Sequence, residues 1–160
     1  MSTLLLGLGN PILSDDGVGP RLAADFGRRL ADWPGLRVEP DCAVGGLELL
    51  DLLTGHERVI VLDALQTADP EPGRWHAFDA RALRETLHLD NVHDANFATA
   101  LALGRRLGLP LPADAAIYIF GVEVADACTF SERMTPALEL GYPVYAEAIF
   151  SAVCRLLAEA

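Results

Sequence analysis

The stretch from Thr3 to Gly19, TLLLGLGNPILSDDGVG, constrains the fold of this chain more than any other. It begins with a continuous apolar run, typical of a parallel strand that is covered on both faces. Two glycines and a turn at Asn10 separate this run from the pair Asp15-Asp16, and an amphipathic helix follows. The stretch therefore predicts a buried strand that brings carboxylates to its carboxyl end, where open α/β sheets bind ligands.

Length and composition indicate one globular domain over residues 1–160. The chain is long enough to bury a substantial core, and 51% of its residues are hydrophobic. Its formal net charge of −11 argues against binding to nucleic acid or to an anionic membrane surface, because both need basic residues to neutralise phosphates. A small molecule, a metal cation or a partner protein fits this charge.

The same sequence favours a cytoplasmic protein. It begins without a basic secretory leader, and no apolar run approaches the roughly 20 residues that span a bilayer. The three cysteines include no C-x-x-C pair and are odd in number. We therefore expect free thiols in a reducing compartment.

Strands and helices alternate along the chain, which predicts a three-layer α/β sandwich. Strands are predicted at residues 4–8, 36–41, 58–63, 74–78 and 115–124, with 74–78 at an edge. Helices are predicted at residues 17–33, 47–54, 79–87 and 95–107, and from Pro136, with Thr135 as its N-cap. The residues predicted to face inward from these helices are Val18, Leu22, Phe26, Leu30, Trp33, Leu47, Leu50, Leu53, Phe97, Leu101, Gly104, Tyr145, Ile149, Val153 and Leu156.

Three side chains are candidates for a site. Asp16 follows the first strand, Asp63 closes the third, and His93 lies in the loop before a long helix. If crossovers are right-handed and the second strand lies outside the first, then the first and third strands are neighbours and bring Asp16 and Asp63 together. Two carboxylates and an imidazole suit a borderline divalent metal, or a general acid and base.

Other motifs are absent or incomplete. Gly7-x-Gly9 resembles the start of a dinucleotide fingerprint, but Ile12 occupies the position of its third glycine. The chain has no P-loop, G-x-S-x-G or H-E-x-x-H motif. Cys42 follows the second strand without a partner in the sequence, and we interpret it as a buried small apolar residue.

These residues resemble the hydrogenase maturation proteases, which trim the C-terminus of the nickel-containing hydrogenase large subunit. The segment GLGNPILSDDGVGP follows that family's G-x-G-N-x-x-x-x-D-[DE]-G-x-G opening. The resemblance continues through Asp41, the segment Gly46–Leu50, the run VLDAL, His93 and FSERMTPAL. It spans nearly the whole chain in the same order.

The resemblance implies a five-stranded, mostly parallel twisted sheet of order 2-1-3-5-4, with the fourth strand antiparallel. It implies that Asp16, Asp63 and His93 contact a metal, the nickel already installed in the substrate, so that the protein carries no permanent cofactor. The partner would be the large-subunit precursor, from which a C-terminal peptide is released. Some relatives carry Glu at the position of Asp16. The segment Glu123–Ser131 is among the parts that resemble the family less, and it is expected to help to choose the precursor.

The mechanism stays open at this point. Nickel could polarise the scissile carbonyl or activate water, or a carboxylate or His93 could act as general base while the metal serves recognition only. Three other functions fit part of the same pattern. Peptidyl-tRNA hydrolases also begin with G-L-G-N-P, but their Thr-Arg-His-Asn run is absent here and the charge disfavours tRNA. The second alternative is a chaperone that checks the metal of the precursor without cutting it. The third is an α/β domain that binds another small ligand.

Overall fold

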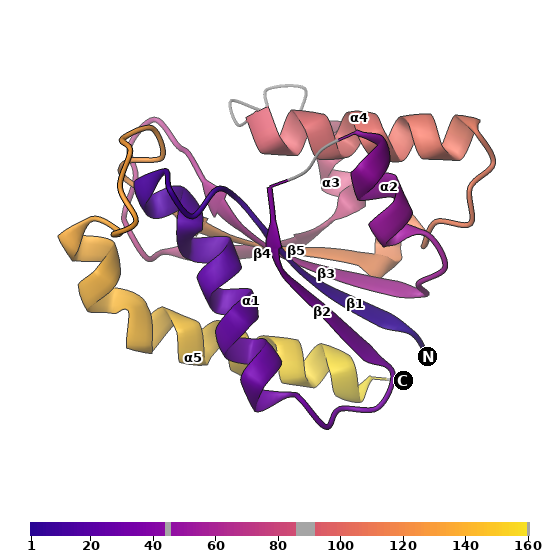
Figure 1. The fold of residues 1–160 in the computed structure, drawn as a ribbon, viewed down its shortest axis with the longest axis horizontal. Coiled ribbons are helices and arrows are strands. Elements are labelled where there is room, and N and C mark those ends of the chain that lie inside the picture. Colours follow the sequence, from indigo (N-terminus) through magenta and orange to yellow (C-terminus); the bar gives the residue numbers. More distant parts are fainter. Residues whose placement is uncertain (44–45, 86–91, 160) are drawn as a thin grey trace.

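A computed structural model describes residues 1–43, 46–85 and 92–159 of the chain (Figure 1). Within them, a five-stranded sheet lies between helices. The strands are β1 (Thr3–Leu8), β2 (Leu36–Cys42), β3 (Arg58–Leu65), β4 (Trp75–Asp79) and β5 (Ile117–Glu123). The helices are α1 (Val18–Arg29), α2 (Leu47–Leu53), α3 (Ala80–Glu85), α4 (Val92–Arg106) and α5 (Pro136–Ala158), with 3₁₀ turns η1 (Ser14–Gly17) and η2 (Asp114–Ala116).

The sheet has the order β2-β1-β3-β5-β4. β1 pairs in parallel with β2 and β3, β3 pairs in parallel with β5, and β4 is the antiparallel edge strand. The predicted order and the single antiparallel strand are confirmed. Since β1 and β3 are neighbours, their carboxyl ends lie side by side. We call this end of the sheet the carboxyl edge.

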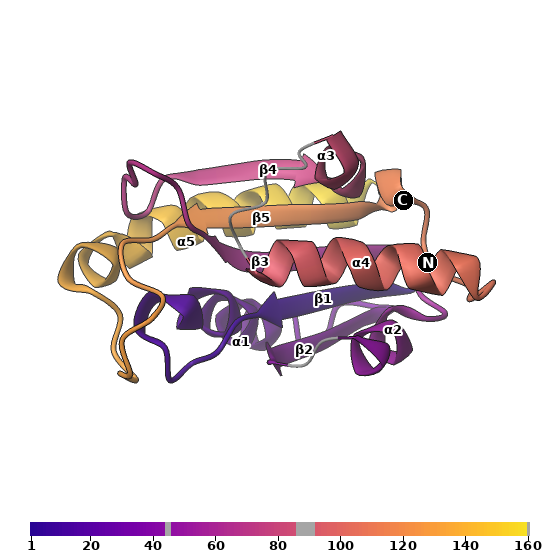
Figure 2. The same ribbon diagram turned by 90° about the horizontal axis from the view of Figure 1, so that it is seen from above.

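Helices cover both faces of the sheet, as the two views in Figures 1 and 2 show. α1 and α5 pack on one face, and α2, α3 and α4 pack on the other. The alternation of side chains along β3 divides its apolar residues between these layers: Ile60 and Leu62 face α1 and α5, whereas Val59 and Val61 face the other helices. The strands are therefore buried on both faces, which explains their continuous apolar character.

Most of the inward-facing residues were predicted correctly; Leu47 was not, and Leu156 is only partly buried against the core. Leu47 is 64% exposed. α2 begins at Leu47 itself, so the residue that packs on the sheet one turn before Leu53 is Leu49. In α5, Leu157 is buried in place of Leu156 because the buried stripe continues from Tyr145 at intervals of four residues. The predicted helix over 17–33 ends at Arg29, and Trp33 is half-buried beyond it.

α5 is long and apolar enough, by length and composition alone, to cross a membrane. Its apolar residues have another explanation, because Leu138, Ile149 and Val153 are fully buried in the layer between α5 and the sheet. Its N-cap is Thr135, as predicted, and Pro143 lies inside the helix.

Candidate functional site

The connection from β1 to α1 is folded tightly against the carboxyl edge. Gly9 has a φ of +135°, and a Cβ there would lie 2.1 Å from the carbonyl oxygen of Asp16. A Cβ on Gly19 would lie 2.3 Å from the Leu8 carbonyl oxygen and 2.4 Å from that of Leu62. The start of α1 therefore lies directly on the ends of β1 and β3, and only glycine permits this approach.

Asp16 lies in η1, the single turn between β1 and α1, which contacts β3. Its side chain is only 2% exposed. Its Oδ2 accepts a hydrogen bond of 2.7 Å from the backbone N–H of Asn10. This bond fixes one oxygen of the carboxylate at the turn that leaves β1.

Asp63 is 1% exposed and lies within β3, which continues two residues further to Leu65 than predicted. Its Oδ1 accepts a hydrogen bond of 2.8 Å from the backbone N–H of Ala64. By the alternation along β3, its side chain belongs to the face that α4 covers. Asp16 and Asp63 thus lie at the carboxyl edge of adjacent strands, as the sequence predicts.

His93 lies in the first turn of α4, because this helix begins at Val92. The predicted placement in the preceding loop was wrong. The first turn of α4 is at the carboxyl edge in both ribbon views, but the His93 side chain lies outside the described part of the structure. Among the described side chains, no group of three His, Cys, Asp or Glu residues is arranged to hold a metal ion. The role of His93 as the third residue of the site therefore stays a prediction.

Asp15, the residue before Asp16, is entirely buried. Its carboxylate accepts hydrogen bonds from Thr135, Ala125 and Asp126, in the segment between β5 and α5. The Thr135 hydroxyl donates to Asp15 and makes no capping bond to α5. Sequence reasoning missed this role, since the partners lie more than a hundred residues away.

The segment between β5 and α5 also lies against the turn after β1. The Ser14 N–H donates to the Ser131 carbonyl at 2.8 Å, and the Ser131 N–H donates to the Ile12 carbonyl at 2.9 Å. Phe130 is 82% exposed and Ile12 is 45% exposed. We call the exposed side chains of residues 11–12 and 127–134 the loop surface.

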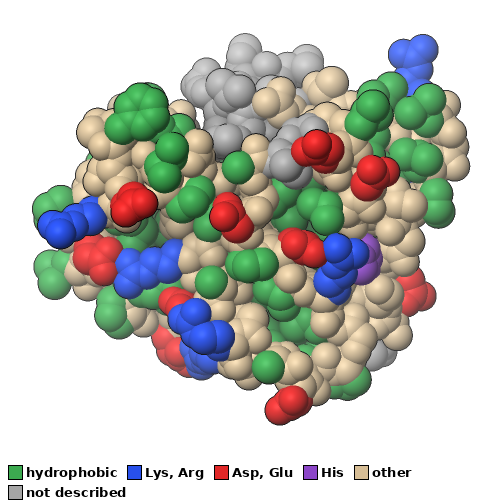
Figure 3. All heavy atoms as spheres, in the orientation of Figure 1, with side chains coloured by type: hydrophobic (Ala, Val, Ile, Leu, Met, Phe, Trp, Pro, Cys, Tyr) green, Lys and Arg blue, Asp and Glu red, His purple; other side chains and the backbone are tan. Residues whose placement is uncertain are grey.

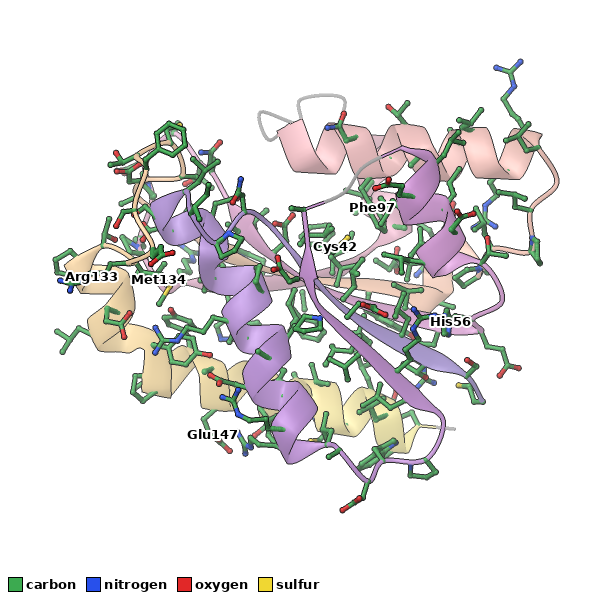
Figure 4. The ribbon with its side chains drawn as sticks, in the orientation of Figure 1. Cys42, His56, Phe97, Arg133, Met134 and Glu147 are labelled. Atoms are coloured by element: carbon green, nitrogen blue, oxygen red, sulfur yellow. The ribbon has the colours of Figure 1, made fainter. Side chains whose placement is uncertain are left out.

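A cleft of about 620 Å³ opens beside the loop surface, between it and the first turns of α1 and α5. Arg133 and Met134 line it and lie at the start of α5 (Figure 4). Figure 3 shows arginines among apolar and acidic side chains at this end of the molecule. The cleft is flanked by Ser14 and Gly17, the two ends of the turn that carries Asp16.

Another buried carboxylate, Glu123, ends β5 and was not singled out from the sequence. Its Oε2 lies 2.8 Å from Nε2 of His76, and its Oε1 accepts from the Thr67 hydroxyl at 3.2 Å and from the Glu71 N–H at 3.3 Å. The hydrogen bond with His76 is the main cause that lowers the pKa of Glu123. Glu123 thus holds the connection between β3 and β4 against β5.

The three cysteines form no disulfide, and Cys42 is buried at the end of β2, as predicted. Comparison with protein-family models finds no match, and comparison with the curated proteins finds none. Solved structures do match. The chain resembles the hydrogenase maturating endopeptidase HybD from E. coli with a TM-score of 0.75 and 22% identity, over 97% of this chain and 93% of that one.

Two further structures agree. The [NiFe] hydrogenase maturation protease HybD from Thermococcus kodakarensis matches with a TM-score of 0.63 and 23% identity, over 95% of this chain and 99% of that one. The maturation protease HycI from the same organism matches with a TM-score of 0.63 and 16% identity, over 98% and 92%. The chain has the fold of the hydrogenase maturation endopeptidases. Because these matches extend over nearly all of both chains, the fold holds from β1 to α5.

Proposed function

We propose that this chain is a peptidase that removes the C-terminal extension of a hydrogenase large-subunit precursor once nickel has been installed in it. One observation carries the proposal. Two buried carboxylates, Asp16 and Asp63, lie at the carboxyl ends of adjacent strands in the fold of hydrogenase maturation endopeptidases. The peptidase activity for which these similar structures are named supports the reaction class, and the carboxylates supply its chemistry.

Nickel enters this proposal as part of the substrate. Asp16, Asp63 and His93 would offer it two oxygen ligands and one nitrogen ligand, a set that suits a borderline divalent ion with positions left open. Carboxylates with 2% and 1% exposure are shielded from water, which strengthens their attraction to a cation. A precursor without nickel lacks the central contact, so the metal makes cleavage conditional on its insertion. The protein itself needs no permanent cofactor.

The reaction is hydrolysis of one peptide bond. A water oxygen bonds to the scissile carbonyl carbon, the C–N bond breaks, and the departing nitrogen takes a proton. Either nickel polarises the carbonyl or activates the water, or one of the carboxylates or His93 removes the water proton while nickel only docks the substrate. Both routes place Asp16 and Asp63 at the reacting bond.

Precursor choice is proposed to depend on the loop surface. Phe130 projects from the segment between β5 and α5 with 82% of its area exposed, and Ile12 lies on the adjoining turn. An apolar side chain that is exposed in the free protein stabilises a complex when a partner covers it. The formal charge of −11 favours a basic docking face on the precursor. We propose that the two proteins meet in the cytoplasm.

The site assignment is tested with a nickel-loaded precursor and four proteins: the unaltered chain and its Asp16→Asn, Asp63→Asn and His93→Ala variants. We measure the intact mass of the precursor after incubation with each protein. Of these four proteins, we expect only the unaltered chain to remove a defined C-terminal peptide. Asp32→Asn is the matched control, because it removes one exposed carboxylate close after the C-terminal end of α1, and it should cleave normally. Normal cleavage by His93→Ala would contradict the assignment.

A further inference from the structure

The Asp15 side chain accepts four hydrogen bonds from one distant segment of the chain. Its Oδ1 accepts from the Thr135 backbone N–H at 2.6 Å. Its Oδ2 accepts from the Thr135 hydroxyl at 2.9 Å and from the backbone N–H groups of Ala125 and Asp126 at 3.1 Å each. An ionised carboxylate only accepts hydrogen bonds, so these donors match it. With no exposed area, Asp15 is inaccessible to a substrate.

The turn that contains Asp15 cannot hold its shape alone. η1 is four residues long and begins at Ser14, whose φ of +52° is unfavourable for a residue with a side chain. A single helical turn without tertiary contacts is unstable in water. Contacts with the segment between β5 and α5 compensate, since the Asp15 N–H donates to the Asp126 carbonyl at 2.9 Å.

Asp16 is the next residue of the same turn, so its carboxylate is positioned by whatever fixes η1. The hydrogen bond from the Asn10 N–H to Asp16 Oδ2 depends on that position. Asp15 and Asp16 therefore face opposite neighbours from one short turn: Asp15 is bonded to the segment before α5, and Asp16 to the turn that leaves β1.

We propose that Asp15 is a positioning residue of the proposed peptidase: by bonding η1 to Ala125, Asp126 and Thr135, it holds the Asp16 carboxylate at the carboxyl edge. This inference rests on the proposed function for its catalytic consequence. It also couples the loop surface to the site, because the segment that carries Phe130 begins and ends at the residues that Asp15 binds.

The direct test is Asp15→Asn, which keeps the shape of the side chain. In this variant an amide NH₂ group replaces one accepting oxygen. Its N–H donors would then face the N–H and O–H donors that bind Asp15, and no hydrogen bond could form there. We expect kcat for nickel-loaded precursor to fall roughly 100-fold, as for a catalytic group displaced by about 1 Å, with KM within about threefold. Thr135→Val, which removes the hydroxyl and keeps the carboxylate, should lower kcat less, and Thr135→Ser should restore it.

A second test of the proposal does not require a measurement of peptidase activity. The amide resonance of Asn10, followed by NMR, reports the bond to Asp16 directly, and we expect its shift and its hydrogen-exchange protection to be lost in Asp15→Asn. Tyr142→Phe is the control for stability. It removes a buried hydroxyl of α5 that bonds to Asp25, away from η1, and should change neither the Asn10 resonance nor kcat.

Three results would overturn the proposal: an unchanged Asn10 resonance in folded Asp15→Asn, a kcat equal to that of Tyr142→Phe, or a rise in KM alone. If Asp15→Asn does not fold, Thr135→Val decides by the same two readings. If the unaltered chain cleaves no precursor, the proposed function fails, while the Asn10 resonance still decides whether Asp15 positions Asp16.

Discussion

Gly19 shows how closely single residues control the site. It lies in the first turn of α1, where a Cβ would meet the carbonyl oxygens of Leu8 and Leu62 at 2.3 and 2.4 Å. Those atoms belong to the backbone of β1 and β3 and cannot move aside as a flexible side chain can. Any side chain at Gly19 must therefore push α1 and η1 away from Asp63.

We predict that Gly19→Ala lowers the free energy of unfolding by roughly 3 kcal/mol, because overpacking against fixed atoms is destabilising. Gly141→Ala is the matched control. It also lies inside a helix, but its Cβ would meet Tyr145 at an ordinary 3.6 Å, so it should stabilise the protein by about 0.5 to 1 kcal/mol. Urea denaturation measures both. Equal effects of the two variants would contradict the packing argument.

At this scale the sequence predicted the carboxylates and not their division of roles. Asp16 and Asp63 could be placed because each follows or ends an apolar strand, and neighbouring strands bring such residues together. Asp15 could not be assigned, because its donors at Ala125, Asp126 and Thr135 are distant in the sequence. Three of the four donors are backbone N–H groups, which the side-chain letters do not reveal.

Among the elements, the connection from β3 to β4 depends on Glu123. Thr67, Glu71 and His76 all bond to its carboxylate, and Arg74 lies 3.6 Å from it. The connection is rich in proline and glycine and has few apolar residues of its own. Its position beside the carboxyl edge is therefore maintained by this carboxylate together with backbone hydrogen bonds between Glu123 and the residues Gly73 and Arg74.

This arrangement predicts an acid-dependent loss of stability. Hydrogen bonding with His76 lowers the pKa of Glu123 in the folded protein, so its contribution is present above the ordinary carboxyl pKa and is lost as pH falls through the lowered value. The difference in unfolding free energy between the unaltered chain and Glu123→Gln should shrink as pH falls from the ordinary carboxyl pKa through the lowered pKa of Glu123 in the folded protein. Glu132→Gln, at an exposed residue, should show no such trend. A constant difference for Glu123→Gln would contradict the prediction.

Element boundaries were the less predictable part of the fold. The order of strands followed from apolar runs and from the resemblance, and the structure agrees. The start of α4 was predicted at Ala95 and lies at Val92. The prediction was three residues late because the sequence Asp90-Asn91-Val92-His93-Asp94 has the composition of a turn, although Val92, His93 and Asp94 belong to the helix. Asn and Asp favour caps and turns when only their neighbours in the sequence are considered. In the folded protein, α4 nevertheless begins within this segment.

For the whole molecule, one end carries the proposed chemistry and the exposed apolar side chains together. The loops that follow β1, β3 and β5, and the first turns of α1, α4 and α5, all gather at the carboxyl edge, whereas both chain termini lie toward the other end (Figure 1). Phe130 and Ile12 are exposed there. A precursor bound at this end would contact the loop surface and the site at once.

We predict that Phe130→Ser raises KM for the precursor roughly tenfold, because the complex loses the burial of one aromatic side chain. kcat should change little, since Phe130 is not part of the site. Leu107→Ser is the control: Leu107 is 59% exposed just after the end of α4, away from the carboxyl edge. Steady-state cleavage by both variants decides. Equal KM values for the two would contradict a role of the loop surface in binding.

The central claim is that this chain cuts a hydrogenase precursor only after nickel has been installed. The most direct measurement incubates matched large-subunit precursors, with and without nickel, with the unaltered chain and weighs the products by intact mass. We predict loss of one defined C-terminal peptide from the nickel-loaded precursor and no change in the other. Binding of the loaded precursor without loss of mass would contradict the peptidase and leave a chaperone that checks the metal; cleavage of both forms would contradict the dependence on nickel.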